Sequence, residues 1–212
     1  MKRLLIVDDH TIVREGLLRI LNGMLEQPVV LDEASNGHQA LNMTNSFDYD
    51  LVLLDISLPD QSGLDVLKLI HQKNPKLPVI MFSTYPDEHY AVRSLRSGAA
   101  GYVNKGSEAA VLKQAIEKVL SGKRYVSETQ SELLVDAVTE FKDNQPLHQI
   151  LSDREYQLIC MMSAGKTLSE IARELTISVK TVSTYRARVL EKLHLRTTAD
   201  IINYCSQHGL NL

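Results

Sequence analysis

The chain has 212 residues, of which 44% are hydrophobic and 23% are charged, a composition that excludes a disordered chain. Its apolar runs span only a few residues, whereas a membrane span needs about 18, so no membrane partner is expected. The apolar stretch after Met1 meets Asp8 and Asp9 too early for an export signal. Two cysteines, Cys160 and Cys205, are too few for a disulfide framework, which favours a cytoplasmic protein.

The net charge of −3 is unevenly distributed along the chain. Residues 1–150 carry 15 basic and 20 acidic side chains, whereas residues 151–212 carry 8 basic and 6 acidic ones. This asymmetry indicates two parts of the chain with different partners.

Short apolar runs alternate with segments of helical periodicity through the first 120 residues. The apolar runs are Leu4–Val7, Val29–Leu31, Leu51–Leu54, Val79–Phe82 and Tyr102–Val103. Helical spacing is clear before the second and fourth runs and after the fifth. Five such units predict an α/β fold with a five-stranded, parallel, doubly wound sheet.

The residues that follow these predicted strands indicate phosphoryl chemistry. Asp8 and Asp9 end the first run, Asp55 ends the third, Ser83 ends the fourth and Lys105 follows the fifth. The carboxyl ends of parallel strands meet at one edge, so three carboxylates there would need a cation, and Mg²⁺ suits oxygen ligands. Asp55 would then accept a phosphoryl group with which Lys105 pairs. The alternative for Asp9 is a helix cap.

No Gly-x-Gly-x-x-Gly and no Gly-x-x-x-x-Gly-Lys-[Ser/Thr] motif occurs, which argues against dinucleotide and Walker-type phosphate sites.

The last third of the chain has a different pattern. A helical stripe in residues 127–142 precedes the polar, breaker-rich segment Lys142–Pro146, which we interpret as a linker. Residues 148–212 predict four helices, the first of which starts with a capping box at Ser152–Glu155. The second and third are joined by the turn Thr176–Ser178, the plan of a helix-turn-helix.

The predicted third helix, from about Val179 to Leu193, has two contrasting faces. Its apolar face is expected in the core and consists of Val182, Tyr185, Val189 and Leu193. The opposite face carries small and hydroxyl side chains between cations, which suits a helix in a DNA major groove. It comprises Lys180, Ser183, Thr184, Ala187, Arg188 and Glu191. A solvated amphipathic helix is the alternative interpretation.

Residues 1–121 resemble a response-regulator receiver domain, which has a flavodoxin-like fold. The resemblance rests on Asp8-Asp9, on Asp55 with Pro59 and Gly63 behind it, and on Ser83, Tyr102 and Lys105 at the family's spacing. It implies that a sensor histidine kinase phosphorylates Asp55. It also implies a metal site of Asp9, Asp55 and the Ser57 carbonyl, with Asp8 acting through water. Ser83 would move toward the phosphoryl group, and Tyr102 would rotate inward.

Residues 148–212 resemble the LuxR-type helix-turn-helix domain, and the combination resembles the NarL/FixJ class of response regulators. The signatures are Leu151–Glu155, Ile171-Ala172, Ile177–Val182 and Leu190–Leu193. The resemblance implies that bases are contacted by Ser183, Thr184 and Ala187, and phosphates by Lys180, Thr181, Arg188 and Lys192. Thr176 departs from the family, which often has glycine there, so the turn lacks an easy residue for positive φ.

The expected organisation is a receiver at 1–121, a linker with a helix at 122–147 and a DNA-binding domain at 148–212. The expected function is a transcription regulator, not an enzyme, that binds promoter DNA as a homodimer when phosphorylated, with RNA polymerase as a further partner. Receiver masking of the recognition helix is a hypothesis.

Two alternatives stay open on the sequence. A small-molecule phosphatase would want a second acid two residues after Asp55, where Ser57 stands. An adaptor would use the helical half to bind protein in place of DNA.

Overall fold

The computed structural model describes residues 1–24, 28–139 and 146–210. The chain forms two compact units, residues 1–136 and 137–212. Within the described ranges no helix is long and apolar enough to cross a bilayer.

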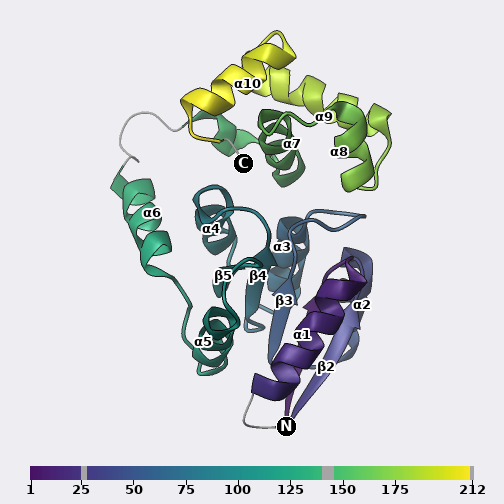
Figure 1. Ribbon diagram of the computed structural model, residues 1–212, viewed down its shortest axis with the longest axis vertical. Coiled ribbons are helices and arrows are strands. Elements are labelled where there is room, and N and C mark those ends of the chain that lie inside the picture. Colours follow the sequence, from purple (N-terminus) through teal and green to yellow (C-terminus); the bar gives the residue numbers. More distant parts are fainter. Residues whose placement is uncertain (25–27, 140–145, 211–212) are drawn as a thin grey trace. The chain divides into compact units, whose positions relative to one another are not determined.

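The first unit is built on five parallel strands in the order β2-β1-β3-β4-β5 (Figure 1). They are β1 (Lys2–Val7), β2 (Val29–Ala34), β3 (Leu51–Leu54), β4 (Val79–Ser83) and β5 (Gly101–Asn104). The predicted α/β fold is thus confirmed. Every residue of β3 and β4 is buried, which explains why these strands read as continuous apolar runs.

Five helices flank this sheet: α1 (Thr11–Met24), α2 (Gly37–Ser46), α3 (Gly63–Lys73), α4 (Asp87–Arg96) and α5 (Ala109–Leu120). α1 and α5 pack on one face, where Leu17 and Ile116 meet Ile6 and Leu53 in the main core. α2 packs against α3, and α4 against β5. The sequence pattern does not single out α2 and α4, because polar residues are frequent in both, and the buried side of α4 itself includes His89 and Ser94.

β2 is longer than the predicted run Val29–Leu31. It continues through Asp32 and Glu33, which lie opposite Leu5 and Ile6 of β1. An edge strand can carry charged side chains, and both are paired: Asp32 with Arg3 Nε at 2.6 Å and Glu33 with Arg14 Nε at 2.9 Å. The apolar run alone therefore underestimates the length of β2, because the strand continues through charged residues.

One further helix, α6 (Glu128–Thr139), lies in the segment expected to hold a linker helix. Its start is a reciprocal cap, because the Ser127 N–H donates to Gln130 Oε1 and the Gln130 N–H donates to Ser127 Oγ, both at 3.2 Å. Phe141 and Lys142–Gln145 lie outside the described residues. The boundaries 1–121 and 148–212 are kept as our proposal for the two domains.

The second unit contains a short 3₁₀ segment (Leu147–Ile150) and the four predicted helices. They are α7 (Asp153–Ser163), α8 (Leu168–Glu174), α9 (Val179–Lys192) and α10 (Thr198–Gln207). The predicted capping box of Ser152 and Glu155 is present at the start of α7. Neither Cys160 nor Cys205 forms a disulfide with a described residue, and both are buried.

The predicted apolar face of α9 holds for Val182, Val189 and Leu193, which are at most 3% exposed, whereas Tyr185 is only half-buried.

The turn between α8 and α9 keeps a left-handed residue although no glycine is present. Thr176 has φ 55°. Its N–H donates to the Arg173 carbonyl, and the Ile177 N–H donates to the Ala172 carbonyl. This pair of bonds is a Schellman motif, in which glycine is the usual left-handed residue. The turn therefore has the left-handed backbone conformation of a Schellman motif at the expense of strain in Thr176.

Candidate functional site

Most predicted site residues of the first unit follow the carboxyl ends of β1, β3 and β5, whereas Ser83 is the last residue of β4 and Tyr102 lies within β5. β1 and β3 are neighbours in the sheet, so the acidic residues behind them meet. One carboxylate oxygen each from Asp8, Asp9 and Asp55, and one ring nitrogen of His10, lie within 4.8 Å of one another. Sequence reasoning found the acids and missed His10. Its position directly behind the acidic pair was the available signal.

Lys105 links two of these acids. Its Nζ lies 2.6 Å from Asp8 Oδ2 and 2.8 Å from Asp55 Oδ2. The other Asp55 oxygen, Oδ1, accepts the Ile56 N–H at 2.7 Å. Asp8 and Asp55 are 1% and 3% exposed, so this arrangement is nearly dry. The structure thus brings the predicted acceptor carboxylate and the predicted lysine into direct contact.

The charge at this edge is unbalanced. Burial raises the pKa of Asp55; the Lys105 ammonium opposes the rise and the Asp8 carboxylate adds to it. Burial alone would lower the pKa of Lys105, but the charges of Asp55 and Asp8 outweigh burial and raise it. Three carboxylates beside one lysine leave an excess of negative charge in a poorly solvated place. This donor set fits Mg²⁺, which takes carboxylate oxygens.

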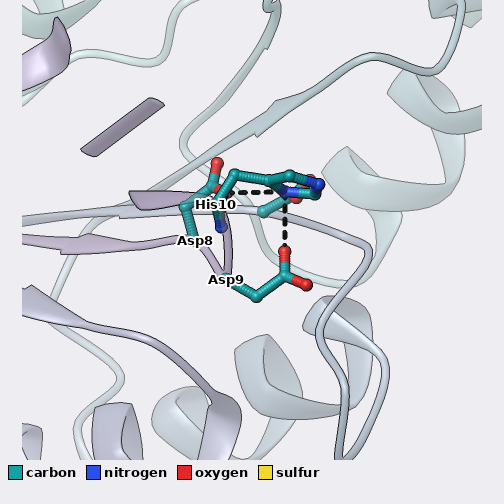
Figure 2. A group of neighbouring side chains, drawn as sticks. Asp8, Asp9 and His10 are labelled. Carbon is teal, nitrogen blue, oxygen red and sulfur yellow. Dashed lines mark hydrogen bonds and ion pairs between the residues drawn. The ribbon is translucent and has the colours of Figure 1, made fainter. Parts of the chain in front are cut away.

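The His10 ring contacts both Asp8 and Asp9 (Figure 2). Its Nδ1 lies 2.8 Å from Asp9 Oδ1 and 3.2 Å from Asp8 Oδ1, and its ring is largely exposed. The backbone N–H of His10 donates to Asp8 Oδ1 at 2.9 Å. Asp8, and not Asp9, therefore accepts the His10 N–H. The helix α1 begins at Thr11, and the His10 carbonyl accepts the N–H groups of Val13 and Arg14, so His10 and not Asp9 lies at the N-cap position.

The loop behind Asp55 folds back tightly at Gly63. A Cβ at this position would lie 1.9 Å from the Asp55 carbonyl oxygen, so only glycine fits. The Gly63 N–H donates to the Ile56 carbonyl at 2.8 Å, which closes the loop. In this loop the Ser57 hydroxyl donates to the Tyr85 hydroxyl at 3.1 Å. The loop that carries Asp55 and the loop after β4 are thereby joined.

Ser83 and Tyr102 lie on the neighbouring strands β4 and β5, where Ser83 is opposite Asn104 and Tyr102 is opposite Met81. The Ser83 side chain is fully buried, and its Oγ has no hydrogen-bond partner among the described residues. Tyr102 is also fully buried, and its hydroxyl donates to the Tyr85 carbonyl at 2.5 Å. Burial raises the pKa of this phenol, so it stays a donor. Tyr102 already occupies the inward position that the resemblance implied for the phosphorylated state.

The predicted DNA-facing side of α9 is open in part. Lys180, Thr184, Ala187 and Arg188 are exposed, and Thr181 and Ser183 are half-buried. Lys180 and Arg188 form no ion pair with any described residue. The Thr184 hydroxyl donates to the Lys180 carbonyl at 3.0 Å, so it is turned to its own helix. Two unpaired cations thus flank small side chains on this face.

Lys192 differs from the other predicted phosphate contacts. Its Nζ lies 2.6 Å from Oε2 of Glu155, whose side chain is 3% exposed. Burial raises the pKa of Glu155, but hydrogen bonds from Lys192 and Ser152 outweigh it and lower the value. Lys192 therefore pairs with the glutamate of the capping box of α7. The Glu155 carboxylate largely neutralises the charge of Lys192.

Comparison with known proteins supplies the family. The model of the response regulator receiver domain matches residues 4–117, and that of the LuxR family of bacterial regulatory proteins matches residues 149–205. The chain belongs to the response regulators of the NarL/FixJ class. This response regulator is 33% identical to the response regulator UvrY of Escherichia coli strain K12 over 99% of its own length and 96% of that protein.

Two further relatives agree with this assignment. The response regulator GacA of Pseudomonas viridiflava is 32% identical over 99% of this chain and 98% of its own. A solved complex of the response regulator RcsB with DNA is 25% identical, with a TM-score of 0.56, covering 97% of this chain and 98% of its own. Response regulators receive signals from histidine kinases and bind DNA, and their receiver domains bind Mg²⁺ at an acidic cluster.

Proposed function

We propose that this response regulator is a DNA-binding transcription regulator that is switched by phosphorylation of Asp55. The observation that carries the proposal is the contact of Lys105 with both Asp55 and Asp8 at the carboxyl edge of the sheet. It supplies a nucleophilic carboxylate, a cation for the added phosphoryl group and an acidic group for a metal in one place. The same chain carries a LuxR-type helix-turn-helix.

The chemistry is transfer of a phosphoryl group from a phosphohistidine of a sensor histidine kinase. An Asp55 oxygen forms the new P–O bond while the P–N bond to the donor breaks, and the donor imidazole keeps the electron pair. The Ile56 N–H fixes Oδ1, and the Lys105 ammonium lies at Oδ2. Lys105 would then pair with a phosphoryl oxygen.

Asp9, Asp55 and the carbonyl of Ser57 would hold Mg²⁺, with Asp8 acting through water. The bound ion would neutralise charge on the phosphoryl oxygens. Ser83 would donate its hydroxyl to the phosphoryl group, because its Oγ is buried and has no other partner among the described residues. The Ser83–Tyr85 loop would shift together with Ser83. This shift would reach Tyr102, because the Tyr102 hydroxyl donates to the Tyr85 carbonyl. Phosphorylation of Asp55 would thereby change the conformation of the β4–α4 segment.

DNA would be bound by α9. Lys180, Thr181 and Arg188 would contact phosphates, while Ser183, Thr184 and Ala187 would approach base edges. Lys192 contributes less than the resemblance implied, because Glu155 holds it. So few phosphate contacts make the binding of one copy weak and sensitive to salt, which favours a homodimer on two half-sites. Contact with RNA polymerase is a further expectation.

Phosphorylation by a small donor such as acetyl phosphate tests the acceptor. Mass spectrometry of peptides should place one phosphoryl group on Asp55, and Asp55→Asn should abolish it. Asp48→Asn is the matched control, because Asp48 is an exposed carboxylate without a described contact. Modification that persists in Asp55→Asn would refute the assignment.

DNA binding is tested by selecting sites from random duplexes with the phosphorylated full-length chain. The phosphorylated protein should bind the selected sites more tightly than the unphosphorylated protein and than Asp55→Asn. Equal affinity of all three forms would refute phosphorylation control.

A further inference from the structure

No described strand pairs with the outer side of β5, and a later segment of the chain covers that side. β5 is an edge strand, so the backbone groups on its outer side need partners other than a strand. The Tyr125 N–H donates to the Ala100 carbonyl at 2.8 Å, just before β5. A Cβ on Gly101 would lie 3.1 Å from Tyr125 Cβ, which shows how closely the two segments approach. Residues 125–130, the edge strap, follow α5, run along β5 and include the first turn of α6 (Figure 1).

The edge strap ends in a buried amide that contacts two other elements. Gln130 is 2% exposed. Its Nε2 donates to the backbone carbonyl of Tyr102 at 3.0 Å and to Oδ2 of Asp87, in the first turn of α4, at 2.8 Å. Its Oε1 accepts the Ser127 N–H that starts α6. Both amide hydrogens thus have acceptors, and the same side chain completes the cap of α6.

Both acceptors are connected to the β4–α4 segment that phosphorylation is expected to move, because Asp87 starts α4 and Tyr102 contacts the loop before it. Tyr102 donates its hydroxyl to Tyr85, in the loop that connects Ser83 with α4. A shift of this loop would change the separation between the Tyr102 carbonyl and Asp87. One planar amide holds both acceptors only at a fixed separation, because its two N–H directions are fixed. The position of α6 therefore depends on the state of the β4–α4 segment.

We propose that Gln130 couples the phosphorylation switch to α6, the helix through which the chain leaves the receiver. The proposal rests on the proposed function of Asp55. In one state the amide binds Tyr102 and Asp87 together and holds α6 against β5. In the other state one of the two bonds is lost, and the first turn of α6 is released. Gln130 acts as a positioning residue and touches no reacting atom.

The test compares the full-length wild-type chain with Gln130→Leu, which keeps the size of the side chain and removes its donors. Glu132→Gln is the matched control, because Glu132 lies on the same helix but is exposed. Hydrogen–deuterium exchange of peptides from α6 is measured with and without acetyl phosphate. Affinity for duplexes selected by the phosphorylated wild-type chain is measured on the same samples, as is the phosphorylated fraction of Asp55.

Wild type and Glu132→Gln should show a change in exchange of α6 on phosphorylation, and a gain in DNA affinity of the order of 5–150-fold. In Gln130→Leu, Asp55 should be phosphorylated to the same extent, while exchange of α6 no longer responds and the affinity ratio falls to within about twofold of one. Asp87→Ala, which removes one acceptor and leaves the cap of α6, should lower the ratio partially. Asp87→Ala therefore tests the coupling even if Gln130→Leu does not fold.

A wild-type response of α6 and of DNA affinity in both variants would overturn the coupling by Gln130 while leaving the proposed function intact. A wild-type protein that accepts no phosphoryl group, or whose DNA affinity ignores it, would overturn both. The two failures are distinguishable, because only the second is shared by wild type and Glu132→Gln.

Discussion

Replacement of Thr176 by glycine should stabilise the second unit. Thr176 has φ 55°, and its side chain is exposed, so the substitution removes strain without removing a buried contact. A left-handed conformation costs a residue other than glycine about 1–2 kcal/mol, and a β-branched side chain belongs at the upper end. Glycine loses more chain entropy on folding, about 0.5–1 kcal/mol. The expected net gain is about 1 kcal/mol.

Thermal and urea unfolding of the full-length chain, followed by far-UV circular dichroism, measure this gain. For a unit of the size of residues 137–212, about 1 kcal/mol corresponds to a rise in Tm of roughly 4–8 °C. Gly165→Ala is the matched control, because Gly165 has φ 81° after α7 and should lose stability by a similar amount. Thr176→Ala keeps the left-handed strain without the β-branch, so its Tm should lie between those of wild type and Thr176→Gly.

A Tm of Thr176→Gly at or below that of Thr176→Ala would refute the reasoning. It would mean that the Schellman turn imposes no measurable strain on threonine, or that the entropy of the unfolded chain outweighs it.

Three further predictions concern the two sites. Because burial raises the pKa of Asp55 above the unfolded value of about 3.9, wild type loses stability as the pH rises through that raised pKa. Asp55→Asn should therefore be more stable than wild type at pH 8, and the difference in Tm should vanish below about pH 4, where Asp55 is protonated in both the folded and the unfolded chain. Mg²⁺ at about 100 times its Kd should stabilise wild type by about 2.7 kcal/mol. In a thermal-shift titration with Mg²⁺, Asp9→Asn should lose most of this stabilisation. Equal stabilisation of wild type and Asp9→Asn would exclude Asp9 as a metal ligand. Arg188→Ala should weaken DNA binding and lower the slope of log affinity against log salt by about 1, whereas Glu191→Gln should leave the slope unchanged.

Local patterns sufficed for the fold and for bringing most residues of the proposed phosphoacceptor site to one edge of the sheet. β3 and β4 are visible as apolar runs because both of their faces are buried, and parallel strands bring residues behind them to one edge. Asp8, Asp55 and Lys105 could be placed together for this reason, before any distance was known. The apolar face of α9 and the cap at Ser152 were visible likewise, since both depend on residues three or four positions apart.

Only the tertiary structure shows which of the functional side chains form contacts with distant residues of the chain. The contact of Lys192 with Glu155 spans 37 positions, and that of Gln130 with Asp87 spans 43, so neither leaves a periodic signal. His10 belongs to the acidic group through its side-chain orientation, and Thr176 keeps its turn because the hydrogen bonds at the end of α8 require it. Periodicity is a property of one segment, whereas the partner of a side chain depends on how separate segments pack.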